Sequence, residues 1–143
     1  MSLSVQWLVE EGAAIEVEEA SHKRVVVAIV RGPCNRILLA ERVALNILSR
    51  ASGIAAGARR GVAVAAAHNW PGYVAGTRKT TPGFQAVEKY ALLVGGAATH
   101  RLNLSQMVML KDNHIWSCGS ISDAVSKARR ACGFSSKIEV VPQ

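Results

Sequence analysis

Apolar and polar residues alternate along the first part of the chain, in the pattern of half-buried β-strands. Residues 4–9 alternate strictly, and residues 13–17 alternate again after a turn, which predicts a β-hairpin. The continuous apolar run at residues 25–30 predicts a further strand, which Gly32 and Pro33 end. The chain is therefore expected to open with a fragment of antiparallel sheet.

The next stretch has the periodicity of an α-helix. Apolar residues lie on one face over residues 35–56, and an alanine-rich second helix is expected over residues 55–67. Glu41 falls on the apolar face and Arg42 lies at its margin, where a charge is costly unless it is paired. Two interpretations remain open, an internal contact between Glu41 and Arg42, or an arginine presented across a subunit boundary.

Strands alternate with helices in the second half of the chain. Helices are expected at residues 84–94, stopped by a glycine pair, and after a capping box that begins at Ser120. Strands are expected at residues 72–75, 107–110 and 137–141. This alternation is typical of βαβ units and a parallel sheet, and three parallel strands are too few to close a barrel. We therefore expect an α/β chain, α+β overall.

The chain is basic, with a formal net charge of +7 over 143 residues. This charge is compatible with nucleic acid, an anionic membrane surface or small anions as partners. No apolar run reaches the roughly 18 residues that span a bilayer, and no cleavable signal is visible, so no membrane partner is expected. The cations cluster in loops beside strands, which favours small anions over nucleic acid. A small basic nucleic-acid binder remains the alternative from another functional class.

Cysteine usage indicates the compartment. Cys34, Cys118 and Cys132 are odd in number and not closely paired. Neither a disulfide framework nor a Cys-rich zinc site follows from them, and a reducing compartment, the cytoplasm, is expected.

Cations follow the predicted strands at comparable places. Arg78 and Lys79 come directly after the strand at residues 72–75, in a loop that a Pro-Gly pair ends. His100 and Arg101 lie in the next connector, and Lys111 ends a further strand. Side chains at the carboxyl ends of parallel strands meet at one edge, where α/β folds bind their ligands. These cations are therefore expected to converge on an anion, although any one such pair could be a solvated turn. His114 is interpreted as a structural histidine.

The motifs, taken together, resemble the quinolinate phosphoribosyltransferase family, which is also called nicotinate-nucleotide pyrophosphorylase (carboxylating). The resemblance covers almost the whole chain and rests on these runs: Glu41–Asn46, Ser52–Ala55, Gly76–Gly83, Glu88–Tyr90, Gly95–Ala97, His100–Arg101 and Lys111–His114. It implies a pentosyltransferase of NAD biosynthesis. Such an enzyme converts quinolinate and phosphoribosyl pyrophosphate to nicotinate mononucleotide, carbon dioxide and pyrophosphate, with Mg²⁺.

The resemblance also implies an architecture. Residues 1–56 would form part of an N-terminal open α/β sandwich that contains the dimer helix. Residues 57–143 would form part of an incomplete parallel α/β barrel. Homodimers or higher homo-oligomers that share active sites are expected.

Matching positions assign roles to individual residues. Thr77, Arg78, His100 and Arg101 would hold the quinolinate carboxylates, and Arg42 would reach in from the neighbouring subunit. Lys79 would face the phosphates and Lys111 would lie between the two substrates, which makes these two lysines the expected catalytic residues. No residue of this chain is expected to bind the metal.

The sequence also departs from the family pattern. An acidic residue is expected at position 141, where Val141 stands, and Glu139 matches a different glutamate of the same strand. The chain is about half as long as the family enzyme, so we expect a truncated form that is inactive by itself. The alternative is a non-catalytic truncated isoform that binds full-length subunits.

Overall fold

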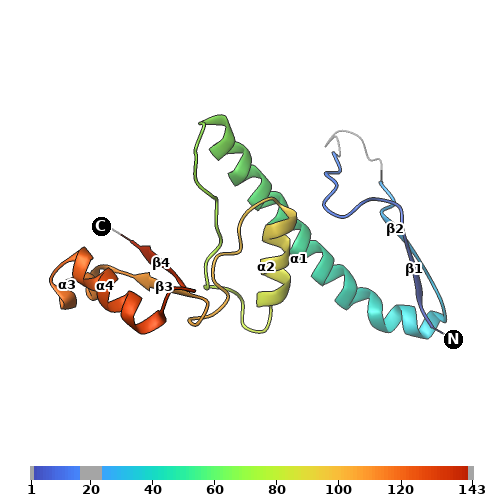
Figure 1. Ribbon diagram of the computed structural model, residues 1–143. Helices are drawn as coiled ribbons and strands as arrows, with labels where there is room; N and C mark the ends of the chain where they lie inside the picture. The colour runs from blue at the N-terminus through green and yellow to red at the C-terminus, as the bar shows by residue number, and fades with distance from the viewer. Residues whose placement is uncertain (1, 17–23, 142–143) are drawn as a thin grey trace. The chain divides into compact units, whose positions relative to one another are not determined.

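The computed structural model describes residues 2–16 and 24–141 (Figure 1). The chain forms two compact units. Unit 1 consists of Met1–Gly76 and Thr80–Thr99, and unit 2 consists of Thr77–Lys79 and His100–Gln143. Among the described residues, no helix combines the length and the apolar character needed to cross a membrane.

Unit 1 begins with an antiparallel strand pair, which agrees with the predicted fragment of antiparallel sheet but not with the predicted hairpin partner. β1 (Ser4–Trp7) pairs with β2 (Ala28–Arg31). The predicted partner at residues 13–17 is wrong in its described part, because residues 13–16 form no strand, and residue 17 lies outside the described residues. The β-branched residues of β2 suit a ladder better than the adjacent alanines at positions 13 and 14.

A single helix, α1 (Cys34–Ala67), replaces the two helices that the sequence predicts. Its 34 residues contain glycines but no proline, so no ladder hydrogen bond is lost inside it. Pro33 occupies the N-cap position, where its missing N–H costs nothing. The alanine-rich second half, with its high helix propensity, continues the first half without a break.

α2 (Gln85–Val94) confirms the helix predicted at residues 84–94 and packs against α1 (Figure 1). Ala58 of α1 and Ala91 of α2 are buried in the unit 1 core. At Gly95, a Cβ atom would collide with the carbonyl oxygen of Ala55 and would lie 2.6 Å from the Ala58 Cβ. The two helices therefore approach so closely because the contact consists of small residues.

The strand predicted at residues 72–75 is reduced to one parallel bridge between Ala75 and Ala98. Two backbone hydrogen bonds hold it, from Gly76 N to Ala98 O and from Ala98 N to Val74 O, each 2.9 Å. The predicted parallel direction is confirmed but the extended strand is not. Glycines on both sides of this short run weaken its strand propensity.

Unit 2 is a βαβ unit, as the sequence predicts. β3 (Met107–Leu110) pairs in parallel with β4 (Lys137–Val140), and α4 (Ile121–Cys132) connects them. Ser120 Oγ accepts the backbone N–H of Asp123 at 3.1 Å, which confirms the predicted cap. A short helix, α3 (Asp112–Cys118), follows β3 directly, where the sequence analysis expected only a strand end.

The tight α1–α2 contact gives a prediction about packing. Replacing Gly95 with alanine should lower the free energy of unfolding by about 1–3 kcal/mol, because the new methyl group has no room. Gly53→Ala is the matched control. Gly53 lies in α1, and no atom lies within 4 Å of the position that its Cβ would take, so alanine should stabilise the helix by about 0.5–1 kcal/mol. Urea unfolding of both variants tests this, and equal effects of the same sign would contradict it.

Candidate functional site

Thr77, Arg78 and Lys79 form an exposed loop segment of unit 2. The backbone N–H of Lys79 donates to the Thr77 hydroxyl oxygen at 3.1 Å, which bends the segment into a tight turn. The two cationic side chains of this turn are therefore accessible to a ligand.

His100 and Arg101 are held against the β3–β4 sheet within unit 2. His100 Nε2 lies 2.7 Å from Oε2 of Glu139, on β4. Arg101 Nη1 donates to the Met107 carbonyl oxygen at 2.9 Å, and Nη2 lies 3.7 Å from the Met109 sulfur, on β3. Both side chains are partly buried, so the sheet fixes their positions. Glu139 was expected on this strand, but its contact with His100 was not predicted from the sequence.

The backbone at His100 is unusual. Its φ of 58° is in the left-handed region, which histidine adopts more often than most residues but at some conformational cost. Such a conformation persists only where the surroundings stabilise it.

Lys111 lies at the carboxyl end of β3 and at the N-cap position of α3, and it is exposed. Its backbone N–H donates to His114 Nδ1 at 3.0 Å. His114 therefore caps the start of a helix, in agreement with its interpretation as a structural histidine.

Arg42 lies on α1 in unit 1 and is exposed, like Glu41. These two described residues form no ion pair with each other, so the internal contact that the sequence left open is not formed. The presentation of Arg42 to a neighbouring subunit stays a prediction.

Sequence analysis missed a polar network centred on Glu88, a buried residue of α2 with 8% of its surface exposed. Its Oε1 accepts hydrogen bonds from Thr81 Oγ1 at 2.7 Å and from Arg50 Nη2 at 2.9 Å. Its Oε2 accepts the Thr81 backbone N–H at 3.2 Å. The hydrogen bond from Arg50, and then those from Thr81, hold the pKa of the Glu88 carboxyl below its usual range. The helical periodicity could have indicated that Glu88 is buried, because position 88 lies on the same face of the helix as Phe84 and Ala91.

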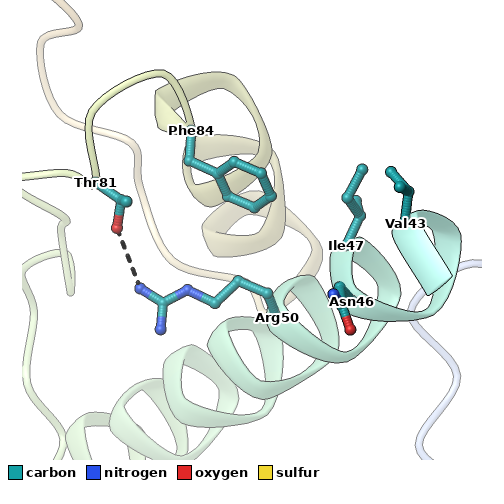
Figure 2. Close-up of a pocket in the computed structure, with 6 residues that line it drawn as sticks. All are labelled: Val43, Asn46, Ile47, Arg50, Thr81 and Phe84. Carbon is teal, nitrogen blue, oxygen red and sulfur yellow. Dashed lines mark hydrogen bonds between the residues drawn. The ribbon is translucent and has the colours of Figure 1, made fainter.

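Arg50 spans the distance between the two helices. Figure 2 shows its side chain extending from α1 towards Thr81, with Phe84 near by. Arg50 Nη2 lies 3.5 Å from Thr81 Oγ1. An open cavity of about 550 Å³ adjoins this contact. The residues lining it are Val43, Asn46, Ile47, Arg50, Thr81 and Phe84.

The neighbouring residue, Lys89, is also buried, with 4% of its surface exposed. Its ammonium group donates a hydrogen bond to the carbonyl oxygen of Thr99. Burial lowers the pKa of the Lys89 amine, because the charged form is poorly solvated there. α2 thus carries two adjacent buried charges with different partners.

Comparison with known proteins identifies the family. The family model of the quinolinate phosphoribosyl transferase N-terminal domain matches residues 1–52, and that of the C-terminal domain matches residues 54–141. The chain belongs to the quinolinate phosphoribosyl transferase family. Both the resemblance and the α/β fold class inferred from the sequence are confirmed.

Curated relatives and solved structures agree on the family. The chain is 54% identical over 140 residues to a nicotinate-nucleotide pyrophosphorylase (carboxylating) from Rattus norvegicus, covering 98% of this chain and 45% of the relative. A Dictyostelium discoideum protein of the same name is 46% identical, with coverage of 98% and 50%. The chain therefore spans about half the length of the curated relatives it matches.

Among solved structures, NadC from Streptococcus pyogenes superposes with a TM-score of 0.83 at 37% identity, covering 99% of this chain and 49% of that one. The nicotinate-nucleotide pyrophosphorylase from Francisella tularensis superposes with a TM-score of 0.80 at 30% identity, covering 98% and 48%. The folded segments of the chain thus match part of a larger family member.

The lowered pKa of Glu88 predicts how the free energy of unfolding of this chain depends on pH. Because the pKa of Glu88 is lower in the folded than in the unfolded chain, the carboxylate stabilises the fold above its ordinary pKa of 4.5. This contribution is lost as the pH falls through the lower value of the folded state. Urea unfolding at pH 7 and pH 4 should therefore show a smaller loss of stability for Glu88→Gln than for the wild type. An identical loss in both proteins would contradict the prediction.

Proposed function

We propose that this chain carries the quinolinate-binding half of a quinolinate phosphoribosyltransferase site. The enzyme transfers a phosphoribosyl group to quinolinate in NAD biosynthesis, forming nicotinate mononucleotide, carbon dioxide and pyrophosphate. Support comes from the family membership and from relatives that are named for the carboxylating pyrophosphorylase reaction.

The observation that best supports the proposal is the parallel bridge between Ala75 and Ala98. Because the bridge is parallel, both chain segments leave it in the same direction. Thr77 and His100 each follow the bridge by two residues, so the loop cations and the His100–Arg101 pair come after equivalent points of the backbone. This is the arrangement in which α/β folds bind ligands beyond the carboxyl ends of their strands.

The side chains suit a dicarboxylate. In the proposal, the guanidinium groups of Arg78 and Arg101 bind the two carboxylates, since arginine forms bidentate bonds to such groups. Thr77 supplies a hydroxyl donor beside them. His100 Nε2 donates to Glu139, so Nδ1 donates to a substrate carboxylate when the ring is an imidazolium, in which both nitrogens carry a hydrogen.

Two lysines are proposed as the catalytic residues. Lys79 faces the phosphates of phosphoribosyl pyrophosphate, where a compact point charge is suitable. Lys111 lies between the two substrates and stabilises negative charge as pyrophosphate leaves. Both lysines are exposed, so neither is committed to a partner in the core.

We also propose a homodimer or higher homo-oligomer in which Arg42 completes the site of a neighbouring subunit. Leu38, Leu39 and Val43, on the same part of α1, are all largely exposed, so this face would bury apolar area against a second copy. The proposed division into a sandwich part, residues 1–56, and a barrel part, residues 57–143, is retained. A cytoplasmic location is proposed from the free cysteines, of which Cys34 is exposed.

Magnesium, which the resemblance implies, does not fit the residues present. In residues 2–16 and 24–141, no three or more His, Cys, Asp or Glu side chains gather as a metal site requires. Val141 occupies the position where the resemblance places an acidic residue, and its side chain cannot bind a cation. No step of the proposed function therefore runs through a metal.

Val141 also favours a second candidate function, a non-catalytic protein that binds full-length family subunits. The exposed apolar residues of α1 would provide the contact surface. A turnover assay separates this candidate from an active enzyme.

The binding proposal predicts the effect of removing one guanidinium group. Arg78→Ala should weaken quinolinate binding by about 2–5 kcal/mol, because a paired carboxylate loses its partner. NMR titration of the 143-residue chain measures the affinity. Arg130→Ala, an exposed cation on α4, is the charge-matched control and should bind as the wild type does. Equal binding by the Arg78 and Arg130 variants would show that Arg78 is not in the site.

The second prediction concerns turnover. The purified 143-residue chain, given quinolinate, phosphoribosyl pyrophosphate and Mg²⁺, should form no nicotinate mononucleotide, because Val141 offers no polar group at this position. The Rattus norvegicus relative, assayed in parallel, is the positive control. Steady product formation by the purified chain would overturn the prediction and exclude the non-catalytic candidate.

A further inference from the structure

Lys89 of α2 contacts the backbone directly before His100. It donates to the carbonyl oxygen of Thr99, which belongs to the peptide bond leading into His100. A side chain on Gly76 would lie 3.5 Å from that same oxygen and 3.6 Å from Lys89 Nζ. The buried amine therefore lies at the point where both chain segments leave the Ala75–Ala98 bridge.

Glu88 holds the Thr81 end of the loop that carries Arg78. Its carboxylate accepts both the backbone N–H and the hydroxyl group of Thr81. Arg50 of α1 donates to the carboxylate as well, and this guanidinium is half exposed. The end of the loop is thus tied to α2, and through Arg50 to α1.

Adjacent residues of a helix point about 100° apart, so one helical turn reaches two separate segments of chain. Burying a cation and an anion is costly, and apolar residues at such positions are often equally or more stabilising. In some proteins, such buried charges serve to fix the position or register of their partners. Besides Arg50, the partners here are Thr81, through its hydroxyl and its backbone N–H, and the carbonyl oxygen of Thr99, all next to the proposed site.

We propose that Glu88 and Lys89 are positioning residues: Glu88 holds the Thr81 end of the Gly76–Thr81 loop, and Lys89 holds the Thr99–His100 peptide bond. The loop cations and His100 are thereby preorganised for the dicarboxylate. This inference rests on the proposed function of that loop. It extends the function to two residues that touch no substrate. Preorganisation of this kind improves binding because the loop is ordered before the ligand arrives.

The proposal accounts for the backbone at His100. Its φ of 58° carries a conformational cost that the surroundings have to offset. The Lys89 ammonium group binds the Thr99 carbonyl oxygen and so fixes the orientation of the peptide plane that precedes His100. Within unit 2, Glu139 holds the imidazole ring.

The test uses the 143-residue chain and a matched pair of variants in the same loop. Thr81→Val removes the hydroxyl donor to Glu88, whereas Thr80→Val removes the neighbouring hydroxyl, for which Glu88 is not a partner. Backbone amide exchange of residues 77–79, 100 and 101 is measured without ligand, and quinolinate affinity is measured by NMR. Thr81→Val should accelerate exchange at residues 77–79 and weaken quinolinate binding, each about tenfold, as expected for losing a hydrogen bond to a charged group. Thr80→Val should change neither by more than about twofold.

Lys89→Met tests the contact before His100, with Lys127→Met, an exposed lysine of α4, as the matched control. Methionine keeps the buried volume but cannot donate to Thr99. Amide exchange at His100 and Arg101 should accelerate about tenfold, while the core amides of Ala58 and Ala91 exchange as in the wild type. If Lys89→Met does not fold, Thr81→Val, on the exposed loop, decides the question.

The outcomes separate this inference from the proposed function. Failure of the wild type to bind quinolinate would refute the proposed function, and the ligand-free exchange rates would still decide whether α2 positions the loop. Unchanged exchange at the site residues in both the Thr81 and Lys89 variants would overturn the inference. Equal acceleration across the core and the loop would also overturn it, because it would mean that the two charges only stabilise the fold.

Discussion

The close approach of α1 and α2 is the constraint on which unit 1 depends. At Gly95 there is no room for a side chain, because the backbone of Ala55 and the methyl group of Ala58 occupy the space. This contact brings α2 near enough for Arg50 to reach Glu88 across the helix pair. Once α2 is fixed in this way, its buried charges can hold segments that are distant in the sequence.

The charges of the chain divide into two groups with different environments. The cations of the proposed site are exposed or partly exposed, and those with partners contact the sheet of unit 2. Glu88 and Lys89 are buried; Lys89 contacts a backbone carbonyl, and Glu88 contacts Thr81 and the guanidinium of Arg50. A solvated cation can bind a ligand at little desolvation cost, whereas a buried charge is already committed to its hydrogen bonds. The exposed cations are therefore suited to binding a ligand, and the two buried charges are suited to holding other parts of the chain in position.

The wrong predictions from the sequence concern where helices and strands begin, end or continue. The predicted strand at residues 72–75 has a parallel partner, but its glycine neighbours limit the ladder to a single bridge. The two predicted helices are one, because neither a proline nor a capping group interrupts α1. The start of α3 was missed because Lys111–His114 follows a strand in the sequence, and only the contact of His114 Nδ1 with the Lys111 amide indicates a helix there.

The amino-acid sequence by itself determined the family, the α/β class and the cations Arg78, Arg101 and Lys111 as candidate ligand residues, because local motifs and periodicity carry this information. Two further features were also visible in the sequence, the stop of α2 at its glycine pair and the cap at Ser120. Only the tertiary structure decided that Glu88 binds Thr81 and Arg50, and that Lys89 binds Thr99. The reason is that a buried charge is defined by partners from other segments, and the pattern along one helix records only that its face is covered.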